Sequence, residues 1–350
     1  MDLSIAAILA QDGITSGAVY ALLALALVLV FSVTRVIFIP QGEYVAFGAL
    51  TMAALQAHTF PHTATLLAAL GIVTFAVEAL ACLRNPERRL TAARTLGVAL
   101  AKFVIAPLLL LASLKTGIGM NLPMPMQILI TLAIVVPLGP LIYRLAFQPL
   151  AEASVLVLLI VSVGVHFALI GLGLVMFGAE GSRTLAFTDA RFEFGGLSVA
   201  GQSLVIVGTA LSLIVALYLY FERTLSGKAL RATAVNRLGA QLVGIGTTQA
   251  GRLAFTLAAA IGATCGVLIA PLTTVYYDSG FLIGLKGFVG AIIGGLGSYP
   301  IAAAGAITVG LLEAYASFWA SAFKEVIVFT LIIPILLWRS LTSDHVDEEE

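Results

Sequence analysis

The stretch ITSGAVYALLALALVLVFSVT, from Ile14 to Thr34, contains no charged side chain. A helix that crosses the hydrocarbon core of a membrane needs about 20 mostly apolar residues. The stretch therefore predicts a membrane-spanning helix. No basic segment precedes it, and the run is long enough to span, so we expect a retained helix and not a cleaved signal peptide.

The composition extends this interpretation to the whole chain of 350 residues, of which 60% are hydrophobic and 10% charged, with a mean hydropathy of +1.08. Soluble domains have roughly 45–50% apolar and about 25% charged residues. The composition therefore excludes soluble enzymes, nucleic-acid binders, disordered proteins and secreted disulfide scaffolds. The 18 basic and 18 acidic residues balance, so the net charge indicates no partner. Cys82 and Cys265 both lie in apolar runs, which argues against a disulfide framework or a metal cluster.

Further apolar segments follow along the chain and predict more spans. They are 44–58, 64–83, 96–114, 127–143, 154–177, 203–221, 253–272, 284–297, 302–320 and 325–339. The segment 44–58 is short, and the glycine-rich segment 284–297 is shorter still. Short pieces occur at membrane depth as half-helices that are enclosed by protein or line a cavity. We therefore expect an all-α, polytopic transmembrane bundle of about 9–11 spans, including short or re-entrant half-helices.

The basic residues between the spans predict the orientation, because cytoplasmic loops carry the excess of Lys and Arg. One set of alternate loops holds twelve basic residues and the other holds five. The five in the poorer set are Lys115, Arg183, Arg191, Lys286 and Lys324. The richer side is expected to be cytoplasmic, which places the N-terminus outside and an acidic tail, 341–350, inside. If the segment 284–297 does not cross the membrane, the last two predicted spans have the opposite orientation.

The loop 222–252 lies on the predicted cytoplasmic side and contains helix-forming residues from 228 to 243. Small or apolar residues recur there at positions that share one helical face: Ala232, Val235, Gly239 and Leu242. Gly244 and Gly246 follow, as glycines do at helix C-termini. The pattern predicts a short amphipathic helix along the membrane whose small face enters a groove on another protein. A lid-like loop that packs on its own helix ends is the alternative.

Few charged or glycine-rich positions lie within the spans. Glu313 sits near the centre of its span, where a carboxylate is costly and faces protein or a cavity. Glu78 is expected to reach toward Arg84, and His166 to hydrogen-bond with the backbone. The run GGLGSYP, 294–300, breaks too easily for an ordinary helix and can expose backbone groups, as a broken transporter helix does.

Motifs for catalysis are missing from the sequence. Ser226-Gly227-Lys228 resembles the end of a phosphate-binding loop, but Ala229 replaces its hydroxyl residue, so we expect no ATP site in this chain. His58 and His62 flank Pro61 in an outer loop and favour a plain polar loop over a metal site. We expect neither a metal nor a cofactor bound by this chain.

Several further motifs occur together. The chain reads Gly13-Ile-Thr-Ser-Gly17-Ala-Val-Tyr20 near its start and Ile37-Phe-Ile-Pro-Gln-Gly-Glu43 soon after. Tyr143-Arg144 precedes Gln148-Pro149-Leu150, and the inner loop has the pattern G-x-x-L-R-A-x-x-x-N from Gly227 to Asn236. Gly284-Leu-Lys-Gly-Phe288, Gly294-Gly-Leu-Gly-Ser298 and Leu312-Glu-Ala314 follow. This combination resembles the permease subunits of branched-chain amino-acid ABC importers, of the LivH type.

The resemblance implies a single permease domain, 1–340, whose loop 222–252 contains the helix that docks on an ATPase. The residues expected to couple to the ATPase are Gly227, Leu230, Arg231, Ala232, Asn236, Gly239, Ala240 and Gly244. Those expected along the translocation pathway are Gln41, Gly42, Glu43, Gly294, Gly295, Gly297, Ser298 and Glu313. The family usually has N-F-A-H-G-E where this chain reads I-F-I-P-Q-G-E, and only Gly-Glu is kept. Residues 62–124 have no counterpart there and predict an inserted, peripheral helical hairpin.

The implied partners are a second, LivM-like permease, two ABC ATPase subunits that hold the ATP and Mg²⁺, a periplasmic substrate-binding protein and membrane lipid, without nucleic acid. The implied location is the bacterial inner membrane, and the substrate is a branched-chain or related amino acid. A self-contained secondary transporter of a small solute is the alternative, but it needs ionisable groups in the membrane, and Glu313 is nearly the only central one. A membrane enzyme is disfavoured because no nucleophile or metal motif occurs.

Overall fold

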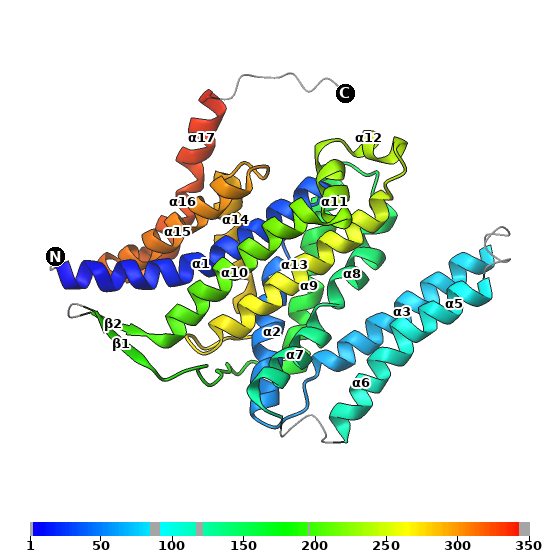
Figure 1. Ribbon diagram of the computed structural model, residues 1–350, viewed down its shortest axis with the longest axis horizontal. Helices are drawn as coiled ribbons and strands as arrows, with labels where there is room; N and C mark the ends of the chain where they lie inside the picture. Colours follow the sequence, from blue (N-terminus) through cyan, green and yellow to red (C-terminus); the bar gives the residue numbers. More distant parts are fainter. Residues whose placement is uncertain (1–2, 85–91, 117–121, 195–196, 343–350) are drawn as a thin grey trace.

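The computed structural model describes residues 3–84, 92–116, 122–194 and 197–342. These residues form a helical bundle with one β-hairpin (Figure 1). The helices are α1 (Leu3–Thr34), α2 (Gln41–Gln56), α3 (Thr63–Arg84), α5 (Ala92–Leu100), α6 (Ala106–Lys115), α7 (Met124–Val135), α8 (Leu138–Ile142), α9 (Val155–Phe177), α10 (Gly201–Arg223), α11 (Leu225–Val235), α12 (Arg237–Leu242), α13 (Thr247–Ile269), α14 (Ser279–Ile293), α15 (Tyr299–Trp319), α16 (Lys324–Thr330) and α17 (Ile332–Thr342). Two π-helical turns, η1 (Ala101–Ile105) and η2 (Tyr143–Phe147), continue α5 and α8, and two short 3-10 turns are η3 (Gln148–Leu150) and η4 (Ser321–Phe323). The hairpin consists of β1 (Arg191–Phe194) and β2 (Leu197–Ala200).

Eight helices of the described residues are long and apolar enough to cross a membrane, which confirms the polytopic helical fold. They cover Ser4–Thr34, Thr63–Leu83, Leu96–Lys115, Met124–Leu150, Val155–Phe177, Gly201–Arg223, Thr247–Ile269 and Tyr299–Trp319. The α14 helix is a shorter apolar helix of 15 residues. Some of the predicted spans are therefore shorter pieces: 44–58 overlaps the 16-residue α2, which ends at Gln56, and 325–339 is divided between α16 and α17.

The α1 helix forms the centre of the bundle and packs against α10, α13, α14 and α15. Nearly every residue of α1 from Ala18 to Val30 is buried. Gly13 and Gly17 let α15 approach closely, because a Cβ at Gly17 would lie 2.9 Å from the Cα of Ile307. These two glycines therefore serve tight helix packing, as small residues do at helix contacts in membranes.

The α2 and α14 helices are short, and they meet near their N-termini. After α1 the chain runs without helix through residues 35–38 before α2 begins at Gln41. A Cβ on Gly42 would overlap the carbonyl oxygen of Gly280, and a Cβ on Gly280 would overlap that of Gly42. The two backbones thus cross in direct contact, and α2 is enclosed by protein along almost its whole length. Short helices of this kind are tolerated in a membrane because the surrounding protein encloses them.

The α3 helix pairs with α5, η1 and α6 at the edge of the molecule. Figure 1 shows this helical pair in blue and cyan, close to α7 at one end and splayed away from the bundle at the other. Large apolar side chains on the pair are exposed, among them Leu80, Leu83, Val98 and Leu109. Such a surface suits contact with lipid, because large apolar patches are rarely left exposed to water.

The bundle has two distinct ends. The hairpin end carries β1, β2 and a bridge between Ser182 and Val275, whereas the α11 end carries α11, α12 and the turn between α14 and α15 (Figure 1). The chain from Val275 to Gly295 therefore passes from the hairpin end to the α11 end through the 15-residue α14. Lys286 was expected in an outer loop, but that prediction is wrong: Lys286 lies within α14 and is buried.

Candidate coupling and translocation sites

The predicted coupling helix is two helices. The sequence pattern predicts one helix over 228–243, but α11 ends at Val235 and α12 begins at Arg237. Asn236 between them is extended, with φ −148° and ψ 102°, and its Oδ1 accepts a hydrogen bond of 2.7 Å from the backbone N–H of Gly239. Asparagine is a poor residue inside a helix and a good N-cap, because its side chain replaces a missing backbone partner. Asn236 therefore starts a second helix.

Several of the predicted coupling residues face inward. Leu230 is 1% exposed and Ala240 is buried. A Cβ on Gly227 would overlap the carbonyl oxygen of Tyr220, so this glycine lets α11 fold back against the end of α10. These residues fix the position of the two helices, and their side chains are not free to contact a partner.

The other predicted coupling residues have local roles of their own. Arg231, expected to bind a partner's carboxylate, forms an ion pair with Glu222 on α10. Ala232 and Gly239 are half-buried. Gly244 has φ +86°, the left-handed conformation that favours glycine, and it ends the segment. A contact of this segment with a partner would therefore involve side chains of α11 and α12 other than the predicted ones.

Large apolar side chains of α11 and α12 lie in the open. They are Leu225, Val235, Leu238, Leu242 and Val243, with exposed fractions from 67% to 87%. We call these five residues the apolar knob. Exposed apolar side chains that gather on one surface mark an interaction site. Only Val235 and Leu242 belong to the helical face predicted from the sequence. That prediction assumed one continuous helix, whereas the chain breaks at Asn236 and α12 starts as a separate helix.

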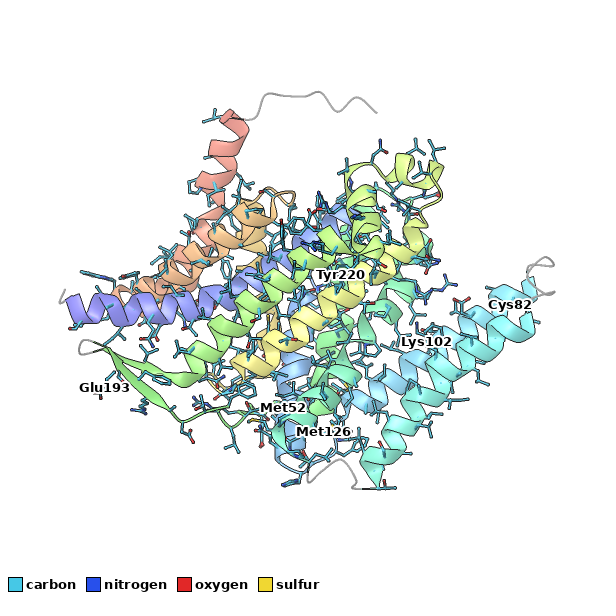
Figure 2. The ribbon with its side chains drawn as sticks, viewed as in Figure 1. Met52, Cys82, Lys102, Met126, Glu193 and Tyr220 are labelled. Carbon is cyan, nitrogen blue, oxygen red and sulfur yellow. The ribbon has the colours of Figure 1, made fainter. Side chains whose placement is uncertain are left out.

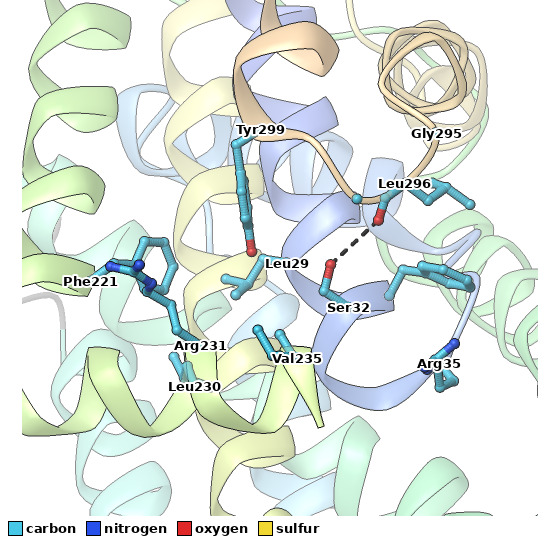
Figure 3. A pocket seen from close by; sticks show the side chains of 13 residues that line it. Leu29, Ser32, Arg35, Phe221, Leu230, Arg231, Val235, Gly295, Leu296 and Tyr299 are labelled. Atoms are coloured by element: carbon cyan, nitrogen blue, oxygen red, sulfur yellow. Dashed lines mark hydrogen bonds between the residues drawn. The ribbon is translucent and has the colours of Figure 1, made fainter. Parts of the chain in front are cut away.

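A cavity of about 370 Å³ joins α11 to the turn between α14 and α15 (Figure 3). It is lined by Leu29, Phe31, Ser32, Arg35, Phe221, Leu230, Arg231, Ala234, Val235, Gly295, Leu296, Gly297 and Tyr299. Ser32 Oγ donates a hydrogen bond of 3.4 Å to the Leu296 carbonyl. Arg35 and Leu296 have positive φ angles of 60° and 56°, which are uncommon for residues other than glycine.

The turn with Gly294, Gly295, Gly297 and Ser298 thus lies at the α11 end, next to the coupling segment. The sequence analysis predicted that these residues line the translocation pathway together with Gln41, Gly42 and Glu43. The structure instead brings the turn together with Arg231 and Val235 (Figure 3). Gly295 has φ +65° and supplies the reversal between the two helices.

Gln41, Gly42 and Glu43 form a buried polar group at the start of α2. Gln41 Nε2 donates a hydrogen bond of 2.9 Å to the carbonyl of Ala258. Glu43 Oε1 lies 2.8 Å from Nδ1 of His166 on α9, with the two side chains 1% and 6% exposed. The backbone hydrogen bond predicted for His166 is not made by Nδ1, which has no hydrogen-bond partner among the described residues.

Some polar atoms of this group have no hydrogen-bond partner among the described residues. They include Gln41 Oε1, both carboxylate oxygens of Glu43, Tyr44 OH and His166 Nδ1, so the close approach of Glu43 to His166 does not have hydrogen-bond geometry. Buried polar atoms are nearly always paired, so each exception calls for an explanation.

Glu313 belongs to a second buried polar group. Its Oε1 lies 2.6 Å from Nζ of Lys286, and its Oε2 accepts a hydrogen bond of 2.7 Å from Tyr20 OH. Lys286 Nζ is also 3.2 Å from Oε1 of Glu325 on α16. The group thus ties together α1, α14, α15 and α16. Separately, Glu78 pairs with Arg144 at 2.8 Å, where the sequence led us to expect Arg84.

Sequence reasoning missed Lys286, Glu325 and the pairing of His166. A usable signal existed for Lys286, because a single lysine in one apolar helix and a single carboxylate in another are expected to pair within a membrane. The pairing of His166 with Glu43 joins residues more than 100 positions apart, and no local pattern indicates it. Among the described residues, no three His, Cys, Asp or Glu side chains gather as a metal site would require.

Comparisons with known proteins identify similar chains. A family model described as "Branched-chain amino acid transport system / permease component" matches residues 9–336. The high-affinity branched-chain amino acid transport system permease protein BraD of Pseudomonas aeruginosa is 27% identical over 342 residues, which cover 94% of this chain and 92% of BraD. The corresponding LivH protein of Escherichia coli is 32% identical over 210 residues, which cover 56% of this chain and 66% of LivH. No solved structure matches.

Proposed function

This chain belongs to the family of permease components of branched-chain amino acid transport systems, and on that premise we propose that it forms the translocation pathway of an ABC importer for branched-chain or related amino acids. A permease component is a multi-pass membrane protein and not an enzyme, so ATP hydrolysis is the task of partner subunits. The two relatives named above are each called a high-affinity branched-chain amino acid transport system permease protein. That name supports the substrate class.

The apolar knob is the observation that carries the coupling proposal. Its five side chains are exposed at one end of the bundle, on helices whose inner residues Gly227 and Leu230 are packed against the bundle. Short helices of this kind are suited to a hydrophobic groove on a partner. We assign that groove to an ABC ATPase subunit, which would hold ATP and Mg²⁺ and move α11 and α12 when it closes.

The cavity shown in Figure 3 offers a route by which this movement spreads. It lies between α11, the end of α1 and the turn at Gly295 and Leu296; Leu230 of α11 packs with Leu29 and Val33 of α1, and Ser32 links the end of α1 to that turn. A displacement of α11 would therefore press on the end of α1 and on the turn between α14 and α15. In this proposal Gly294, Gly295, Gly297 and Ser298 act chiefly in transmitting the movement.

The pathway itself is assigned to the region of Gln41, Gly42, Glu43 and Glu313. Two observations support this assignment. Buried polar atoms at the start of α2 lack partners among the described residues, and α2 and α14 are short helices that meet near their N-termini. Ionisable groups kept inside a membrane protein mark transport paths by default.

The remaining parts of the proposal concern the assembly. We propose a second, LivM-like permease beside this chain, two ABC ATPases on the α11 side and a periplasmic binding protein on the hairpin side, in the bacterial inner membrane. The excess of basic residues in the loops of the α11 side supports that orientation. The helical pair of α3 with α5 and α6 is assigned to the rim of this permease domain.

Transport by the reconstituted system tests the proposal. Proteoliposomes would contain this chain, a second permease and ATPases, with the binding protein outside and ATP inside. We expect uptake of labelled leucine, isoleucine or valine that requires ATP and continues after ionophores have abolished all ion gradients. Uptake by this chain alone, driven by an ion gradient without ATP, would instead support the alternative of a secondary transporter and refute the proposal.

A further inference from the structure

A second cavity lies away from the coupling segment, in the wedge between the peripheral helical pair and the bundle. Its volume is about 590 Å³. It is lined by Leu67, Lys102, Phe103, Pro107, Val136, Pro137, Pro140, Leu141, Gln249, Arg252, Leu253 and Thr256. These residues come from α3, η1 and α6 on one side, and from the α7–α8 junction and α13 on the other.

Most of the wedge is apolar and has stiff walls. Pro137 lies at the junction where α7 ends and α8 begins, Pro140 is in α8, and Pro107 is in the first turn of α6. Proline interrupts the hydrogen-bond ladder of a helix and bends it. These prolines line the place where the helical pair diverges from the bundle in Figure 1.

Two basic side chains, Lys102 and Arg252, line the same wedge. Lys102 lies in the π-helical turn η1, a feature that is frequent at functional sites. Figure 2 shows Lys102 on the part of the helical pair that faces the bundle. Within residues 3–84, 92–116, 122–194 and 197–342, neither basic side chain forms an ion pair. Arg144, by contrast, is neutralised by Glu78.

We propose that this wedge binds an anionic phospholipid, with its acyl chains against Phe103 and Leu141 and its phosphate between Lys102 and Arg252. The wedge lies at the rim of the bundle, where lipid has direct access. Basic pockets between transmembrane helices bind anionic headgroups. Gln249 adds a hydrogen-bonding side chain beside the same lining. The site would lie between the 62–124 segment and the bundle, and it does not depend on the proposed substrate.

Lipid binding to the full-length purified chain tests the proposal. The chain would be delipidated in a mild detergent and titrated with dioctanoyl phosphatidylglycerol or dioctanoyl phosphatidylcholine, with bound lipid counted by native mass spectrometry. We expect tighter binding of phosphatidylglycerol and a loss of roughly tenfold in that affinity when Lys102→Gln is combined with Arg252→Gln. Leu253→Trp would fill the wedge and is expected to displace the lipid while both charges stay in place.

A matched control is Lys115→Gln, which removes a lysine from the same helical pair but outside the wedge, and it should leave the affinity unchanged. Several outcomes would overturn the proposal: equal binding of the two lipids, wild-type affinity in the double variant, or displacement of the lipid by glycerol phosphate alone, which would indicate a soluble phosphate ligand. Loss of the bound lipid when a second permease assembles with the chain would also overturn it and identify the wedge as a subunit contact.

Discussion

Lys286 Nζ lies 2.6 Å from Glu313 Oε1, and the two side chains are 7% and 15% exposed. One lysine here faces two carboxylates, those of Glu313 and Glu325. A buried ion pair contributes little net stability, but removal of one partner is costly because the other charge stays buried. The three charges therefore make the contact of α14 with α15 and α16 sensitive to any single neutralisation.

Lys286→Met should destabilise the fold more than Glu313→Gln. The first change leaves two carboxylates together without their cation and is expected to cost about 3–5 kcal/mol. The second leaves Lys286 with Glu325. Thermal unfolding followed with a thiol-reactive dye measures both, because Cys82 and Cys265 are free and buried. Equal melting temperatures for the two variants would contradict the arrangement.

Glu313→Gln should also reduce amino-acid uptake while the complex still assembles. The glutamine keeps the size of the side chain and a polar contact with Tyr20, but it removes the charge that Lys286 balances. Uptake per assembled complex in proteoliposomes is the measurement. Full transport by Glu313→Leu would remove this residue from the pathway.

Gly42→Ala and Gly280→Ala should each destabilise the fold, because the added Cβ would overlap the backbone of the other helix. Overpacking of this kind costs about 1–3 kcal/mol. Gly171→Ala is the matched control: no atom lies within 4 Å of a Cβ built there, and the helix should gain from alanine. The same thiol-reactive assay ranks the three variants, and a neutral result at Gly42 would rule out the close crossing.

Asn236→Ala should loosen α12 without unfolding the bundle. Loss of the cap to the Gly239 N–H is expected to cost about 1 kcal/mol, and Asn236→Asp should restore it. Hydrogen exchange of the α12 amides is the measurement, with faster exchange in the alanine variant only. The cap also explains why Gly239→Glu is a poor probe of docking, since its side chain would start 3.2 Å from the Asn236 side chain.

Glu43 and His166 should show coupling in a double-mutant cycle. Glu43→Gln, His166→Gln and the double variant are compared in free energy of unfolding, and neighbours in one polar network give interaction energies of about 0.5–3 kcal/mol. The 2.8 Å approach of their atoms in a buried setting predicts a value within that range. Strict additivity of the two changes would contradict the contact.

The sequence was sufficient for the fold class, because each long apolar run, such as Ile14–Thr34, can satisfy its backbone in a membrane only as a helix. It was insufficient where a helix is broken locally. The period of residues 228–243 favours a continuous helix, and only the capping preference of Asn236 opposes it. Where periodicity and capping disagree, the packing of Leu230 and Gly227 against α10 decides the outcome.

The sequence predicted the position of one candidate site residue, Glu313, but not the partners of that residue. A charge in an apolar run marks its own position as unusual, which is how Glu313 was found. Its partners depend on the packing of α14 and α16 against α15, and sequence spacing contains no information on that packing. The apolar knob was hidden because Leu225, Leu238 and Val243 read as ordinary apolar residues until their exposure is known.

Association with an ABC ATPase tests the central claim most directly. Leu242→Asp places a charge on the apolar knob, and Leu185→Asp places the same charge on an equally exposed leucine at the hairpin end; the two leucines are 80% and 73% exposed. The tagged chain would be co-expressed with its ATPases and purified from the membrane. The account predicts that Leu242→Asp loses the ATPase while Leu185→Asp retains it. Normal ATPase recovery with Leu242→Asp, at wild-type levels of the permease in the membrane, would contradict it.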